Sequence, residues 1–224
     1  MQTESRPVIA ILGGSGKEGS GLGFRWAHAG YPVIVGSRSV EKAEQAAGEI
    51  NAALGREAVR GLDNPAAAAA ASIVVLTVPY AAQRSTVEEV RGALPGKILI
   101  DVTVPLVPPK VNRVQLPTGG SAVEAVQKLL GEQVKVVSAF QNISAHHLKD
   151  LDHVIDCDVL VCSDDREAAE TVIGLARAIG LGAWNAGVLA NSAAAEALTS
   201  VLIAMNQRYK VPAAGIRITA IPRP

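Results

Sequence analysis

The feature that most constrains this chain is a glycine-rich turn near its beginning. Val8–Leu12 is a short apolar run, and glycines follow it at Gly14, Gly16 and Gly19. An amphipathic segment, Glu18–Ala29, continues from the turn. Glycines at this spacing, between a strand and a helix, allow a tight turn and let the backbone approach a pyrophosphate closely. Free N–H groups at the helix start also favour an anion. The pattern therefore predicts a strand–turn–helix unit that binds a dinucleotide.

Similar apolar runs recur along the chain and alternate with helical patterns. The expected strands are Val8–Leu12, Val33–Val35, a weaker one at Ala58–Arg60, Ile73–Thr77, Ile98–Val102 and Val134–Val137. The expected helices are Glu18–Ala29, Val40–Leu54 between the cap Ser39 and the stop Gly55, a helix opened by Asn64-Pro65, Tyr80–Ala93 and Ser121–Leu130. Alternation at a spacing of about 25 residues indicates right-handed βαβ units and a parallel, doubly wound sheet.

The alternation changes beyond Ser138. Val154–Cys162 looks extended, whereas Asp164–Ile179 and Ala193–Tyr209 look helical. We therefore expect an α/β fold with two parts. A Rossmann-type dinucleotide-binding domain spans residues 1–138, and a smaller, mainly helical C-terminal domain spans residues 139–224 and closes a substrate cleft.

Composition excludes several classes of partner. Lys and Arg together number 21, and so do Asp and Glu, so the net charge is zero. Without a basic excess, broad binding to nucleic acid or to an anionic membrane is not expected. No run of about 20 strongly apolar residues suggests a membrane span, and the first apolar run is too short for a signal peptide. Cys157 and Cys162 are expected to be buried thiols, as in a cytoplasmic protein.

The end of the second predicted strand indicates which dinucleotide binds. NAD-selective sites place a carboxylate there to bond the ribose 2′-hydroxyl. This chain has Ser37 and Arg38 instead, with Lys42 one helical turn later. One hydroxyl and two cations can surround a 2′-phosphate, and an arginine fork forms charge-assisted hydrogen bonds to it. We therefore predict NADP(H) rather than NAD(H). The alternative is a solvated helix start, because Glu41 and Glu44 are neighbours.

Five motifs, in order, carry a resemblance to a known family. They are G-G-S-G-x-x-G, V-G-S-R-S-x-E-K, L-T-V-P-Y, S-A-F-Q-N-I and D-C-D-V-L-V-C-S-D-D. With the ending Gly215-Ile-Arg-Ile, the chain resembles the F420-dependent NADP reductases from Val8 to about Ile221. The resemblance implies a Rossmann domain, a small C-terminal domain, and the 8-hydroxy-5-deazaflavin of coenzyme F420 in the cleft between them.

Cofactor-binding residues are expected in the glycine turn, at the end of the second strand, and in the loops after the fourth, fifth and sixth strands. The resemblance places the pyrophosphate on the turn, Tyr80 and Arg84 along the cofactor cleft, and Ala145 near the nicotinamide. The full expected set is Gly14, Ser15, Gly16, Lys17, Glu18, Ser37, Arg38, Lys42, Val78, Pro79, Tyr80, Arg84, Val104, Asn142 and Ala145. For Asn142, a bond to a carboxamide or ring edge and a turn-stabilising role are equally open.

Hydride transfer between two coenzymes requires stacked rings and close positioning rather than a nucleophile. The sequence contains no Ser-His-Asp arrangement, no H-E-x-x-H and no Tyr-x-x-x-Lys dyad. We therefore expect no catalytic side chain, because the hydride passes directly between the coenzymes. No metal site is expected either, because adjacent His146 and His147 cannot both face one point on a helix and no third ligand is taken to be near in sequence.

Two other functions remain open. The chain can be an NADPH-dependent reductase of a flavin or another small acceptor, as in the similar oxidoreductase domains of ferric reductases. Gln141 and Gly182 favour this alternative, because some members of the resembled family have a histidine and a basic residue there. It can also be a non-enzymatic NADP(H)-binding sensor. In each case a homodimer is expected, since Ala193–Met205 is apolar and rich in small residues.

Overall fold

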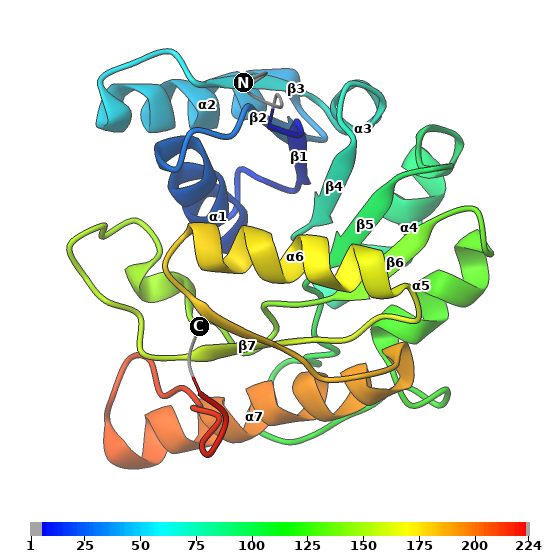
Figure 1. Cartoon of the computed structure of the whole chain (residues 1–224), viewed down its shortest axis with the longest axis vertical. Helices are drawn as coiled ribbons and strands as arrows, with labels where there is room; N and C mark the ends of the chain where they lie inside the picture. The colour runs from blue at the N-terminus through cyan, green and yellow to red at the C-terminus, as the bar shows by residue number, and fades with distance from the viewer. Residues whose placement is uncertain (1–5, 223–224) are drawn as a thin grey trace.

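The centre of the fold is an all-parallel sheet of six strands (Figure 1), seen in a computed structural model that describes residues 6–222. The strands are β1 (Ile9–Leu12), β2 (Val33–Ser37), β3 (Val59–Asp63), β4 (Ile73–Leu76), β5 (Ile98–Asp101) and β6 (Lys135–Ser138). Their order is β3-β2-β1-β4-β5-β6. The direction of winding reverses between β1 and β4, which is where such sheets bind ligands. The predicted Rossmann-type sheet is therefore confirmed.

Helices cover both faces of this sheet because alternate residues of each strand point to opposite sides. Ile9 and Ile11 join one apolar cluster with α1 (Lys17–His28) and α2 (Val40–Leu54). Ala10 and Leu12 join the other cluster, with α3 (Asn64–Ala69), α4 (Tyr80–Val90) and α5 (Ala122–Leu130). Within residues 6–222, every helix falls short of the length and apolar content needed to cross a bilayer.

Helix boundaries follow the capping residues. Ser39 accepts a hydrogen bond from the Lys42 N–H at the start of α2, and Gly55 ends that helix with a φ of 66°, as predicted. Asp63 caps α3 and Ser121 caps α5 in the same way. The predicted helix at residues 80–93 is shorter as an α-helix: α4 ends at Val90, and a 3-10 turn, η1 (Arg91–Ala93), completes it.

The remainder of the chain adds a second, small sheet. It consists of β7 (Asp158–Val161) and β8 (Gly182–Asn185), which are parallel and joined through α6 (Arg166–Ala178). Two 3-10 turns, η2 (Ala145–His147) and η3 (Leu189–Asn191), and the long α7 (Ser192–Tyr209) complete the fold. The extended segment expected at 154–162 is strand only in β7, and β8 was not predicted.

This second part packs directly on the first. Trp26 of α1 donates from its indole nitrogen to the Leu175 carbonyl oxygen of α6 at 3.0 Å. Its ring meets Phe140 edge-on, with ring centroids 5.7 Å apart. Backbone hydrogen bonds also join Ser138, at the end of β6, to Cys162. Residues on both sides of position 138 therefore share one apolar cluster, and a domain boundary there stays a prediction.

A buried carboxylate fastens α7 to the main sheet layer. Glu196 of α7 is fully buried and lies at the start of α5. It accepts hydrogen bonds from the Ser121 hydroxyl at 2.6 Å, the Ala122 N–H at 2.8 Å and the Val123 N–H at 3.2 Å. Burial raises the pKa of Glu196, although these bonds counteract the shift. The side chain thus satisfies amides that a helix leaves unpaired at its N-terminus.

We predict that Glu196→Ala lowers the free energy of unfolding by about 3 kcal/mol, because it leaves buried donors without an acceptor. Glu196→Gln keeps one acceptor oxygen and should lose less than half of that amount. Urea unfolding followed by circular dichroism measures both changes. A loss below about 0.5 kcal/mol for the alanine variant would contradict the assigned role.

Candidate cofactor site

The glycine turn lies at the carboxyl edge of the sheet, between β1 and α1. Gly13 has a φ of +73°, a conformation that favours glycine. Gly19 allows the closest approach: a Cβ there would lie 2.4 Å from the Thr77 hydroxyl oxygen, at the end of β4. Gly16 caps α1 without a side-chain hydrogen bond. The turn is therefore packed tightly against β4, and the first amides of α1 face outward without a side-chain cap.

Two hollows flank this turn, and both include Ser15. Hollow A, of about 210 Å³, lies toward β2. It is lined by Gly13, Ser15, Gly16, Arg38, Asn64, Thr77, Val78, Pro79, Ala82 and Thr86. Hollow B, of about 520 Å³, lies toward η2. It is lined by Ser15, Lys17, Ser20, Ser144, Ala145, His146 and Lys149. A ligand lying across the turn would therefore reach into both hollows.

Arg38 gives hollow A its positive charge. It follows β2 directly, and its side chain is exposed. It forms no hydrogen bond or ion pair with any other residue in 6–222. Its neighbour Ser37 is buried, and the Ser37 hydroxyl accepts a weak bond from the Ser39 N–H at 3.4 Å. Lys42 is exposed one turn into α2. An arginine without a partner, beside a phosphate-binding turn, is available to an anionic ligand.

Asn64 is a further polar residue of hollow A. From the sequence, it was expected only to begin a helix. Its side chain is 1% exposed, and its Oδ1 has no hydrogen-bond partner within residues 6–222. It follows β3, whose last residue, Asp63, pairs in register with Ser37. The Asp63 carboxylate is engaged, because it accepts the Ala66 N–H at 2.7 Å. The sequence position of Asn64 could have indicated a ligand contact, because Asn64 directly follows a strand and ligands bind at the carboxyl edge of such a sheet.

Hollow B brings the predicted Lys17 and Ala145 together. Lys149 and His146 add further basic groups at this hollow, and both are exposed. The adjacent ring of His147 packs edge-on against His146, with centroids 4.6 Å apart. Burial, with neighbouring His153 and His146, lowers the pKa of His147. Hollow B therefore has a basic rim.

The structure separates Tyr80 and Arg84 from these two hollows. Both line a third hollow between α4 and α5, together with Gln83 and Ala122. Arg84 is exposed and pairs with Glu88 along α4, with a nitrogen–oxygen distance of 2.9 Å. Val78 and Pro79, by contrast, line hollow A. The predicted cofactor role of Tyr80 and Arg84 stays a prediction, and it would need a ligand that extends beyond hollows A and B.

Asn142 occupies the turn-stabilising position rather than either hollow. Its amide nitrogen donates to the Asp158 carbonyl oxygen at 2.7 Å and lies 3.2 Å from the Cys157 sulfur. It thereby joins the segment after β6 to β7. Its Oδ1 is buried and has no hydrogen-bond partner in the described part of the chain. The amide nitrogen of Asn142 therefore stabilises the fold, whereas its Oδ1 takes no part in these contacts.

Buried polar groups gather where β5 and β6 end. Asp101 is fully buried and accepts hydrogen bonds from Gln83 Nε2 at 2.7 Å and from the Thr103 N–H at 2.9 Å. Burial raises the pKa of Asp101. Gln141 donates to the Asp101 carbonyl oxygen at 2.7 Å. The preceding residue, Phe140, has a backbone φ of 71°, which is uncommon for a residue other than glycine. The predicted Val104 follows this group and is half-buried.

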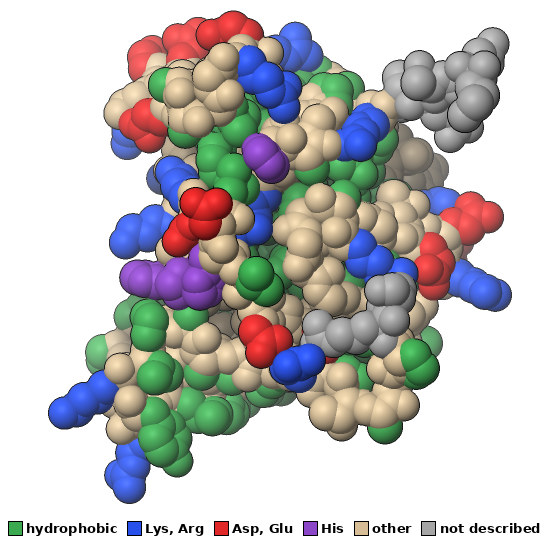
Figure 2. All heavy atoms as spheres, turned by 60° about the vertical axis from the view of Figure 1, so that its left-hand side comes forward, with side chains coloured by type: hydrophobic (Ala, Val, Ile, Leu, Met, Phe, Trp, Pro, Cys, Tyr) green, Lys and Arg blue, Asp and Glu red, His purple; other side chains and the backbone are tan. Residues whose placement is uncertain are grey.

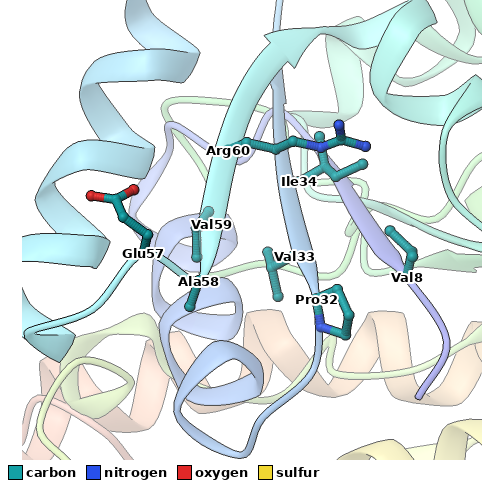
Figure 3. A pocket seen from close by; sticks show the side chains of 8 residues that line it. All are labelled: Val8, Pro32, Val33, Ile34, Glu57, Ala58, Val59 and Arg60. Atoms are coloured by element: carbon teal, nitrogen blue, oxygen red, sulfur yellow. The ribbon is translucent and has the colours of Figure 1, made fainter. Parts of the chain in front are cut away.

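A further hollow lies at the opposite edge of the sheet, beside the amino ends of β2 and β3 (Figure 3). Its wall is mainly apolar, formed by residues such as Val33, Ile34 and Val59. Its charged residues, Glu57 and Arg60, project in different directions. Parallel sheets bind ligands at their carboxyl edge, so hollows A and B are the candidate site.

Glu18, next to the glycine turn, has a strongly raised pKa. It lies in the first turn of α1 and is half-buried. Burial raises its pKa from 4.5 to about 8. The carboxyl group therefore keeps its proton at neutral pH and places no negative charge beside a bound phosphate. The folded chain holds this proton above pH 4.5 whereas the unfolded chain releases it, so stability falls as pH rises toward 8.

We predict that Glu18→Gln, which imitates the protonated form, has little effect on stability at pH 4.5. At pH 9 it should raise the free energy of unfolding by roughly 2 kcal/mol, less than the full pKa difference implies, because the group is partly exposed. Urea unfolding at both pH values measures this. Glu44→Gln, at an exposed position of α2, is the control. Equal effects of Glu18→Gln at the two pH values would disprove the assigned shift.

Comparison with known proteins identifies relatives along nearly the whole chain. A family described as coenzyme F420-dependent NADP oxidoreductases matches residues 8–105. The F420-dependent NADP reductase of Methanocaldococcus jannaschii is 43% identical over 219 residues, which cover 94% of this chain and 97% of the relative. That of Methanothermobacter thermautotrophicus is also 43% identical, over 221 residues that cover 96% and 95%.

A solved structure agrees as well. The crystal structure of an Arthrobacter protein, assigned by its description to the F420-dependent NADP reductases, superimposes with a TM-score of 0.79 at 25% identity. The superposition covers 95% of this chain and 99% of that chain. The resemblance drawn from the five sequence motifs is therefore confirmed, and the chain belongs to the F420-dependent NADP reductase family.

Proposed function

We propose that this protein transfers a hydride between NADP(H) and coenzyme F420. The observation that carries the NADP half is Arg38: an exposed guanidinium without a partner in residues 6–222, lining the same hollow as the glycine turn. The F420 half rests on family membership, because relatives that match over nearly their full length are named for both coenzymes.

The residues of hollow A fit the phosphorylated half of NADP. Arg38 and Ser37, with Lys42 nearby, would hold the 2′-phosphate through charge-assisted hydrogen bonds. The pyrophosphate would lie over Ser15 and Gly16, where the first amides of α1 face a bound anion. The unpartnered, buried Oδ1 of Asn64 would accept a hydroxyl hydrogen from the adjacent ribose. Val78 and Pro79 would form the apolar side of this site.

Hollow B suits the nicotinamide and the second coenzyme. It begins at Ser15, on the other side of the glycine turn, and includes Ala145. The small Ala145 side chain leaves a planar ring free to approach the segment after β6. Lys17 and Lys149 give the rim positive charge, which favours an anionic second substrate. The larger volume of this hollow is consistent with room for two rings.

The coenzymes supply the redox chemistry, and this chain supplies orientation. Hydride transfer needs the donor and acceptor carbons within about 3.5 Å of each other. The residues that line hollow B include no carboxylate, and its basic side chains, Lys17, His146 and Lys149, are exposed. We therefore assign no acid, base or nucleophile to the chain itself. Its contribution is to stack the two rings and to exclude water between them.

Assembly and location are also proposals. We propose a homodimer formed through α7, because Val201, Met205 and Tyr209 make an exposed stripe at a spacing of four residues. Such a stripe is typical of a helix face that packs on another protein surface. A cytoplasmic location is supported by two buried cysteines, Cys157 and Cys162, which both remain free thiols.

We predict that Arg38→Ala raises the dissociation constant for NADPH by about 10- to 100-fold, because it removes a charge-assisted contact to the 2′-phosphate. The constant for NADH, which lacks this group, should change less than about twofold. Fluorescence titration of the reduced nucleotides measures both values. Arg60→Ala, at the opposite edge of the sheet (Figure 3), is the matched control and should leave both unchanged. An equal loss for the two nucleotides would remove the 2′-phosphate assignment.

Turnover tests the complete proposal. Purified protein mixed with reduced F420 and NADP⁺ should form NADPH, which is followed by absorbance, and the same protein should reduce oxidised F420 with NADPH. Lys149→Ala should raise KM for F420 and leave the NADPH dissociation constant unchanged. Turnover with a flavin but not with F420 would instead select a flavin reductase, and tight NADPH binding without any turnover would select a sensor.

A further inference from the structure

Three potential metal ligands lie together at the end of η2 and on the loop that follows it. His147, Asp150 and His153 are spaced three residues apart, and one ligand atom from each lies within 4.8 Å of the other two. The rings of His147 and His153 stack with centroids 3.7 Å apart and planes 17° from parallel. Figure 2 shows one surface patch of histidine side chains and, apart from it, a separate histidine higher in the view. The sequence-based expectation of no nearby third ligand is therefore wrong.

The expectation failed because it assumed a helix. His147 ends the short 3-10 turn η2 and the residues after it form an irregular loop, so His147 and His153 are not held to a helical spacing. In a loop, the chain folds back and brings both rings to one point, and Asp150 lies midway between them in sequence. His146 remains outside this group and lines hollow B.

A buried arginine holds the backbone of this loop in place. Arg25 of α1 is 8% exposed, and its guanidinium donates to carbonyl oxygens of the loop. The acceptors are Leu148 at 2.9 Å, His147 at 3.2 Å, Asp150 at 2.6 Å and His153 at 3.3 Å. All three candidate ligands therefore come from residues whose own carbonyl groups are bonded to a single rigid side chain. A site with fixed backbone positions loses less entropy when a ligand binds.

The Asp150 carboxylate is also oriented. Its Oδ1 accepts hydrogen bonds from the Asp152 and His153 N–H groups, each at 3.2 Å. These bonds leave the second oxygen available, and Asp150 forms no salt bridge within residues 6–222. Hydrogen bonds from neighbouring N–H groups to a carboxylate hold it in the orientation in which it can bind an ion.

We propose that His147, Asp150 and His153 form a binding site for a divalent transition-metal ion of the zinc type. Two imidazole nitrogens and one carboxylate oxygen are a ligand set that suits zinc, with water completing the coordination. Zinc holds its ligands at about 2.0–2.2 Å, so the three side chains must draw closer together than they stand here. Asp150 and His153 are exposed, so their side chains have room to rotate toward a shared ion.

The low negative charge of this site favours zinc over magnesium and calcium. The Arg25 guanidinium interacts electrostatically with Asp150 and partly offsets its negative charge. Magnesium and calcium rely on several charged oxygen ligands, whereas this site has one carboxylate. Imidazole nitrogen binds zinc-type ions without needing a net negative charge. The site should therefore select zinc, nickel or cobalt over magnesium.

Isothermal titration of the metal-free full-length protein with zinc chloride tests the proposal. We expect one equivalent of zinc to bind, and no saturable binding of magnesium chloride. His153→Ala and Asp150→Asn should each weaken zinc binding by at least about tenfold. Addition of cobalt chloride should give visible absorption bands of a low-symmetry site, which both variants lose.

His28→Ala is the matched control, because His28 is an exposed histidine at the end of α1 and lies outside the cluster. Its zinc affinity should equal that of the unaltered protein. Circular dichroism confirms that each variant is folded, and Asp150→Asn retains the oxygen that accepts the two loop N–H groups. Zinc binding that is absent, or that is equal in strength in either ligand variant and the unaltered protein, overturns the assignment.

Discussion

The contact between the glycine turn and the end of β4 sets the geometry of the whole candidate site. Gly19 lies so close to Thr77 that no side chain fits between them. This approach places the start of α1 over the sheet, at the point where the winding direction reverses. Hollows A and B then form on either side of one turn and share Ser15. A dinucleotide that crosses the turn has its phosphates at the helix start and its two ends in separate hollows.

Charge around the turn is arranged consistently with a phosphorylated ligand. Arg38 has no partner in the described residues, so its charge is not compensated within the protein. Glu18, the acid closest to the turn in sequence, keeps its proton because burial raises its pKa to about 8. Asp63 stands next to Ser37 in the sheet but is engaged in capping α3. Of these two carboxyl groups, that of Glu18 is thus neutral and that of Asp63 is engaged in a hydrogen bond, while the Arg38 guanidinium stays available.

The sheet could be predicted from the sequence because its central strands are buried on both faces and read as continuous apolar runs. The edge strand β3 contains Arg60 and Gly61, so its run of apolar residues is short. The predicted strand, Ala58–Arg60, therefore ended three residues before the observed end at Asp63. The four residues of β8 include a glycine and an asparagine, which gave no strand signal. The contribution of Asn64 and the bonding of Asn142 depend on which way a side chain turns, and the pattern of residue types does not specify that.

Arg25 has a consequence for how the two coenzymes meet. One guanidinium gathers carbonyl groups from the loop beyond Ala145 and from Ile179, at the end of α6. The same helix that carries Arg25 starts at the phosphate-binding turn. The loop that borders hollow B and the glycine turn are therefore connected through α1. A ligand that spans both hollows would therefore contact two surfaces that one helix, α1, holds in a fixed relation to each other.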